Sequence, residues 1–247
     1  MSKGLQRSYV NAGGLFFFGD EVSSAFEEDV LSSCLFYQLG ASVKHDKFSE
    51  AVAWRSFYLS AMSKFGHDLL RRQVETIPVA GEDGVWSLVR SELSKKVSPQ
   101  LIERAEISLA QLQKHNSEAS QILKANALRR TVADDRDSVP PAMQTPSAVP
   151  SPNPVSRVSS VCSLQLGFVD KEPLLTQVFV SFEASYPLAD ESCFQLLLQA
   201  NVASNLELMT VTTELNSERY TSIREGIQEK LGARRSELVC RIEEAQS

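Results

Sequence analysis

Apolar and polar residues alternate along the C-terminal half, which predicts a small antiparallel sheet. Successive side chains of a β-strand point to opposite faces, so a period of two is the expected pattern. It covers residues 164–168, 178–184 and 194–202, and a fourth segment at 206–213 is rich in Leu, Val and Thr. Turn-forming residues separate the segments. We expect helices to cover one face of this sheet and the other face to be mostly polar.

In the N-terminal half the apolar residues recur at three- and four-residue steps, which predicts helices. One helix should begin after Asp20 and end near Ala41, and a second should run from Ser49 to Gly66. An edge strand, a short helix and a helix with proline at its first position should follow, at 67–77, 85–93 and from Ser98. Residues 119–130 fit either a helix or an extended segment.

A compact apolar run, Leu15 to Phe18, lies between glycines. It is interpreted first as a buried strand or a plug beneath the first helix. The alternative is an anchor for a membrane or a protein partner, which makes Phe16, Phe17 and Phe18 candidate interaction residues.

The C-terminus carries a second candidate surface. Asn216 caps a helix whose apolar face extends to Gly232, and Leu238, Val239 and Ile242 continue an amphipathic tail. Chain ends fray unless something holds them, so we expect the tail to dock on its own chain or on a neighbouring subunit. We hypothesise that the C-terminal half, including an open sheet edge, supplies a contact between subunits.

Between the two halves, residues 134–160 are rich in Pro and Ser and show no periodicity. Such a segment buries too little apolar surface to order itself, so we expect an extended linker; a docking segment for a proline-binding partner is the alternative. The predicted organisation is a mainly helical part at 1–133, the linker, and a sheet with a C-terminal helix at 161–247. The predicted fold class is α+β. Neither half closes a core by itself, so a core shared by the two parts stays open.

Net charge, cysteine spacing and the lack of long apolar runs bear on the partners and location of the protein. The net charge of −6 gives no electrostatic reason to expect nucleic acid as a partner. The four cysteines are too scattered for a disulfide framework or a zinc site, which favours free thiols in the cytoplasm. We expect no signal peptide, and no apolar run approaches the ~18 residues that span a bilayer.

Catalytic and metal-binding motifs are missing from the sequence. The His45-Asp46 and His67-Asp68 pairs are sequence neighbours and should not face each other. No zinc-protease, nucleophile-elbow or phosphate-loop motif is present. We therefore predict no catalytic residues, no cofactor and no metal, while an enzyme without a recognisable motif stays open.

Three segments, 29–41, 54–58 and 215–232, resemble a group of uncharacterised microbial intracellular proteins of about this length, with helices first and a sheet plus helix at the end. The resemblance implies an intracellular protein whose shared pattern concerns packing or assembly. This chain departs from the group in its long Pro-rich segment.

The leading interpretation is a non-catalytic interaction or assembly protein that binds itself or another protein, as a self-associating subunit of a larger particle. The alternative is an effector or membrane-active protein that uses the Phe run and the amphipathic tail.

Overall fold

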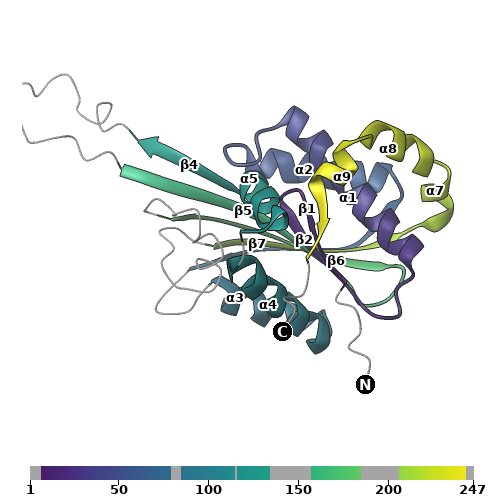
Figure 1. Cartoon of the computed structure of the whole chain (residues 1–247), viewed down its shortest axis with the longest axis horizontal. Coiled ribbons are helices and arrows are strands. Elements are labelled where there is room, and N and C mark those ends of the chain that lie inside the picture. The colour runs from purple at the N-terminus through teal and green to yellow at the C-terminus, as the bar shows by residue number, and fades with distance from the viewer. Residues whose placement is uncertain (1–6, 79–84, 115, 134–156, 185–205, 243–247) are drawn as a thin grey trace, which may run out of the picture.

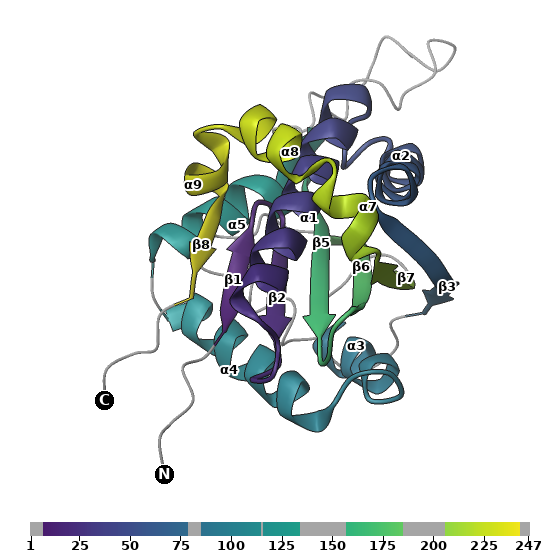
Figure 2. The same cartoon turned by 90° about the vertical axis from the view of Figure 1, so that its right-hand side faces the viewer.

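An eight-stranded sheet with helices on both of its faces forms the described part of the chain (Figures 1 and 2). This computed structural model describes residues 7–78, 85–114, 116–133, 157–184 and 206–242. The strands are β1 (Ser8–Asn11), β2 (Gly14–Phe18), β3 (His67–Ile77), β4 (Leu128–Ala133), β5 (Arg157–Val169), β6 (Leu174–Ala184), β7 (Leu206–Leu215) and β8 (Val239–Arg241). The helices are α1 (Ser24–Lys44), α2 (Ala51–Lys64), α3 (Val85–Leu93), α4 (Pro99–Lys114), α5 (Glu118–Ala127), α7 (Ser217–Thr221), α8 (Arg224–Leu231) and α9 (Arg234–Leu238). The predicted α+β class is confirmed.

The strands follow the order β3-β7-β6-β5-β2-β1-β8, and β4 pairs with the first half of β5. All described pairs are antiparallel except β2 with β5, which makes the sheet mixed. The segment before residue 134 therefore contributes four strands to the same sheet as the C-terminal half. Figure 1 shows β4 and β5 extending together beyond the helices.

Each face of the sheet has its own hydrophobic core. Helices α3, α4 and α5 cover one face, and α1, α2, α7, α8 and α9 cover the other (Figure 2). We call these layers the α4 side and the α1 side. Alternate residues of β2 serve the two cores: Leu15 and Phe17 face the α4 side, while Phe16 and Phe18 face the α1 side. The Phe run is thus a strand covered on both faces, which confirms the first of its two interpretations.

The expectation of a mostly polar second face is wrong. Leu175, Phe179, Met209 and Val211 fill that face and pack under α1 and α2. Gln165 and Gln177 lie on the same face. Both are buried, and each donates a hydrogen bond from its side-chain amide to the Tyr58 hydroxyl. A sheet between two helical layers needs apolar residues on both sides.

Helix boundaries differ modestly from those expected. Helix α1 begins at Ser24 because the Ser23 side chain accepts a hydrogen bond from the Phe26 amide, and it continues to Lys44. Ser98-Pro99 starts α4 as predicted, and Asn216 caps α7 by accepting from the Arg219 amide. The segment 119–130 takes both conformations that the sequence allowed, α5 followed by β4.

The C-terminal tail does not continue as an amphipathic helix. After α9 it becomes β8, which pairs antiparallel with β1, and Ile242 enters the core of the α4 side. The Ile242 amide donates to the Ser8 carbonyl, and the Leu238 carbonyl accepts from the Ala12 amide. The tail therefore docks on its own sheet. The strand expected at 194–202 and most of the segment expected as a linker lie outside the described residues.

Candidate interaction surface

Strand β3 is the long edge of the sheet. It pairs along its whole length with β7, and no other strand of the described chain pairs with its outer edge. The opposite end of the strand order is β8, which has only 3 residues. The regular part of this edge is short. A bulge between Leu69 and Arg71 interrupts the register, and Pro78 follows the last strand residue. β3 therefore offers a bounded row of backbone groups to another strand.

The side chains along this edge are solvent-exposed and partly apolar. Leu69, Leu70 and Val74 are 47%, 55% and 60% exposed. Arg71 and Arg72 are also exposed, and neither has an ion-pair partner among the residues that the structure describes. Exposed apolar residues on a long edge favour pairing with another chain, which makes β3 the candidate contact surface of the described fold.

Arg71, Gln73 and Glu75 share one face of β3, because the register is regular from Arg71 to Ile77. The side-chain amide of Gln73 donates a hydrogen bond to the Glu75 carboxylate, and its oxygen accepts one from the Lys96 ammonium at 3.3 Å. These contacts hold the central residues of the strand from the α4 side and leave the outer edge open.

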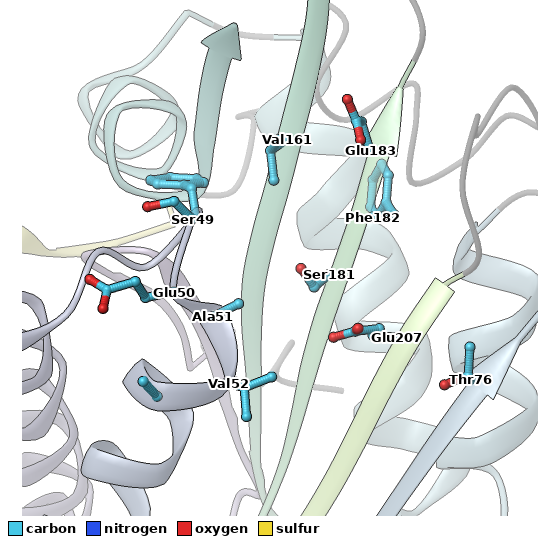
Figure 3. Close-up of a pocket in the computed structure, with 12 residues that line it drawn as sticks. Ser49, Glu50, Ala51, Val52, Thr76, Val161, Ser181, Phe182, Glu183 and Glu207 are labelled. Carbon is cyan, nitrogen blue, oxygen red and sulfur yellow. The ribbon is translucent and has the colours of Figure 1, made fainter.

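A cavity of about 860 Å³ lies where β3, β5, β6 and β7 pass the start of α2 (Figure 3). Glu50, Glu183 and Glu207 contribute carboxylates to its lining, and Glu207 is paired with Arg55 at 2.7 Å. Figure 3 shows these carboxylates coming from separate elements. Strands β6 and β7 lead from this cavity into residues outside the described part.

A serine–histidine pair is present but inaccessible. Ser33 Oγ lies 3.2 Å from His67 Nε2, and His67 Nδ1 lies 3.4 Å from Thr213 Oγ1. Ser33 and His67 are both 0% exposed, and burial lowers the pKa of His67 to about 3. Asp68 points away from this pair and binds Arg219 at 2.6 Å, as expected for neighbours in a strand. The pair is a packing contact and not a nucleophile site.

The Cys34 thiol is as inaccessible as the serine–histidine pair. Burial raises the pKa of the Cys34 thiol to about 12, so this thiol stays protonated and unreactive at neutral pH. Cys34 is a free thiol. Within the described ranges, no group of three or more His, Cys, Asp or Glu side chains is placed to hold a metal ion. Of the helices described, none is both long and apolar enough to cross a bilayer.

The residues that the sequence marks as candidate interaction sites lie within the fold. Phe16, Phe17 and Phe18 are each 0% exposed and Ile242 is 4% exposed, while Leu238 and Val239 are half-buried against the core of the α1 side. An interaction surface on these residues stays a prediction, and it requires the tail or β2 to leave its own sheet. The β3 edge needs no such change.

Sequence reasoning anticipates the edge strand but overlooks its charge pattern. The signal is present in the sequence: Arg71 and Glu75 lie at equal distances on either side of Gln73 within a segment that reads as an edge strand. Such a strand is complementary to itself when two copies run antiparallel.

No protein-family model matches the chain, and no curated protein matches it in sequence. Among solved structures, a delta-endotoxin aligns over 84% of this chain and 85% of its own, with a TM-score of 0.44 and 9% identity. The activated Cyt2Ba monomer from Bacillus thuringiensis subsp. israelensis aligns over 83% and 98%, with a TM-score of 0.43 and 9% identity. The Evf virulence factor aligns over 93% and 84%, with a TM-score of 0.35 and 9% identity. Similarity at this level does not establish a shared fold or function.

Proposed function

We propose that this protein is a non-catalytic, self-associating interaction protein whose contact is the β3 edge, paired antiparallel with β3 of a second copy. The observation that carries the proposal is an edge of 11 residues that no strand of the described chain covers, with exposed apolar side chains and a self-complementary charge pattern. Main-chain hydrogen bonds would supply affinity, and the side chains would set the register.

Charge selects the register. A two-fold axis at Gln73 places Arg71 of each copy opposite Glu75 of the other, which gives two opposite-charge pairs on one face. The same axis places Arg72 opposite Val74, whose methyl groups the arginine stem can cover. An axis at Arg71 or Arg72 would place like charges directly opposite each other, which is destabilising. The register centred on Gln73 is therefore the favoured one.

The ends of β3 limit the contact to a closed pair. The bulge at Leu70 and the proline at 78 stop the regular ladder on both sides. An isologous contact uses up the edge of both copies, so it forms a dimer and not a filament. A larger particle would need a second contact elsewhere on the dimer.

Light scattering with charge reversal tests this proposal. Arg71→Glu places like charges opposite each other twice per dimer, so the dimer should weaken by about tenfold. Glu75→Arg should do the same. The double variant Arg71→Glu with Glu75→Arg restores both pairs and should restore the dimer. Arg234→Glu, an exposed reversal on α9, is the matched control and should leave the molar mass unchanged. A wild type that is monomeric at every concentration, or single variants that associate normally, would reject the contact.

Vesicle flotation distinguishes the second function, an effector or membrane-active protein. In this structure the Phe run that motivates it is buried in β2, so membrane binding would require that strand to open. The proposed dimer stays in solution, and flotation of monomers with vesicles would favour the second function.

A further inference from the structure

A separate groove lies between α1 and α2. It has a volume of about 340 Å³, within the range of small-molecule sites. Three aromatic rings line it, those of Phe36, Phe57 and Phe65, and Phe36 meets Phe65 edge-to-face at 5.4 Å. All three phenylalanines are half-buried, so their rings remain accessible from the groove. The other lining residues are Gly40, Ser60, Ala61 and Lys64.

Gly40 keeps the groove open. It sits inside α1, where glycine destabilises a helix by about 1 kcal/mol relative to alanine. Its backbone does not require glycine, since its φ is not positive, and an added Cβ would make only an ordinary contact with Phe57 at 3.6 Å. Helix packing therefore does not explain the glycine. Any larger side chain at this position would project toward the Phe57 ring and fill the space.

The rim of the groove is basic. The Lys64 ammonium lies 5.4 Å from the centre of the Phe65 ring, and the Lys230 ammonium, from α8, lies 5.9 Å from the centre of the Phe36 ring. Neither lysine has an ion-pair partner within the described residues, and the lining includes no carboxylate. The groove thus combines an aromatic interior with two unpaired positive charges at its edge.

We infer that this groove binds a small organic anion with a flat aromatic body, such as an aryl carboxylate. The ring would pack against the phenylalanine side chains, where offset and edge-to-face contacts are favourable. Its carboxylate would lie between Lys64 and Lys230, which can each donate charge-assisted hydrogen bonds. An aromatic cation would meet repulsion from both ammonium groups, so the charges exclude it. This inference is independent of the proposed dimer.

Calorimetric titration of the full chain with three probes of similar shape tests the ligand class. Naphthoate carries the anion, naphthamide is the neutral analogue and naphthylmethylammonium is the cation. Naphthoate should bind most tightly and the cation should bind least. Equal affinity for all three, or preference for the cation, would overturn the inference.

Variants locate the site. Lys64→Met and Lys230→Met keep most of the stem, so each should weaken naphthoate about threefold to fivefold and leave naphthamide unchanged. Gly40→Leu should weaken both by at least about tenfold while thermal unfolding stays at or above the wild-type temperature, because it adds a helix former where space exists. Lys171→Met, an exposed lysine in the β5–β6 turn, is the control and should change nothing. Unchanged binding to Gly40→Leu, or binding to anionic vesicles without binding of free naphthoate, would overturn the inference.

Discussion

The side-chain amide of Gln177 donates a hydrogen bond to the hydroxyl of Tyr58 at 2.9 Å, across the interface between β6 and α2. Gln165 on β5 donates a second to the same oxygen at 2.7 Å. All three side chains are buried, and burial raises the pKa of Tyr58 well above its usual value. One hydroxyl therefore accepts from two buried amide N–H groups and connects α2 to the centre of the sheet.

We predict that Tyr58→Phe lowers the free energy of unfolding by about 2 kcal/mol or more, because it removes the oxygen that accepts from two buried amides. Within the described chain, Gln177 Nε2 keeps only its contact with Cys34 Sγ at 3.5 Å. Tyr220→Phe is the matched control. Tyr220 is also buried, but its hydroxyl has no hydrogen-bond partner among the described residues, so its removal should be neutral or slightly stabilising. Urea unfolding measures both. Equal losses for the two variants would show that the hydroxyl of Tyr58 is not a hub.

This relationship shows where sequence reasoning reaches its limit. Alternation correctly predicts the strands around Gln165 and Gln177, because backbone geometry dictates a period of two. The same alternation places Gln165 on the face that we expect to be mostly polar, but its side chain is buried. A buried glutamine and an exposed one look identical in sequence, and only the partner, Tyr58 on a distant helix, distinguishes them. Long-range pairings such as the parallel β2–β5 contact escape local pattern for the same reason.

Gly167 on β5 should tolerate no side chain. It lies beside Phe16 in the parallel ladder, and a Cβ at this position would overlap the Phe16 ring. Gly167→Ala should therefore destabilise the fold by about 1–3 kcal/mol, as overpacking does. Gly226→Ala is the control: nothing lies within 4 Å of its Cβ position on the exposed side of α8, so it should stabilise by about 0.5–1 kcal/mol. Thermal unfolding of the pair checks both signs, and a neutral Gly167→Ala would refute this packing.

His67 should make stability depend on pH in mildly acidic solution. Its pKa is lowered by burial from 6.5 to about 3, so the unfolded chain takes up the proton first as the pH falls. The contribution is complete above pH 6.5 and is lost progressively toward pH 3. As the pH falls from 6.5 to about 5 the free energy of unfolding should decrease with a slope that steepens toward about 1.4 kcal/mol per pH unit.

The control variant His67→Gln is compared with the wild type by the slope of unfolding free energy against pH, and not by its absolute stability. His67→Gln keeps a polar side chain beside Ser33 and Thr213 but cannot titrate in this range. Its stability should change much less between pH 6.5 and about 5. Parallel pH profiles for the variant and the wild type would assign the acid sensitivity to other groups.

The C-terminal tail should be part of the fold. Ile242 is 4% exposed in the core of the α4 side, so Ile242→Ala should cost about 2–4 kcal/mol. Val43→Ala, at a residue that is 77% exposed, should change stability by less than about 0.5 kcal/mol.

Truncation after Gly232 removes β8 together with the Arg235–Glu28 ion pair and should destabilise the protein before it affects any oligomer. A truncated chain that unfolds like the wild type would return the tail to the role of a subunit contact.

Only one of the two features of the proposed contact can be predicted from the sequence. The edge position of β3 follows from its polar pattern and the proline after it, but its openness depends on which strands lie beside it. The sequence pattern predicts a subunit contact at Leu238, Val239 and Ile242, because apolar residues close to a chain end need a partner. In the structure β8 pairs with β1 of the same chain. Among the described strands, the long uncovered edge is β3.

Amide hydrogen exchange at two protein concentrations tests the central claim most directly. If two copies pair through β3, amides in residues 71–77 that point away from β7 should exchange slowly at high concentration and fast at low concentration. Amides of β6, which is paired on both sides within the chain, should exchange equally at both. Arg71→Glu should remove the concentration dependence. Exchange in β3 that stays fast and independent of concentration would contradict the β3 contact.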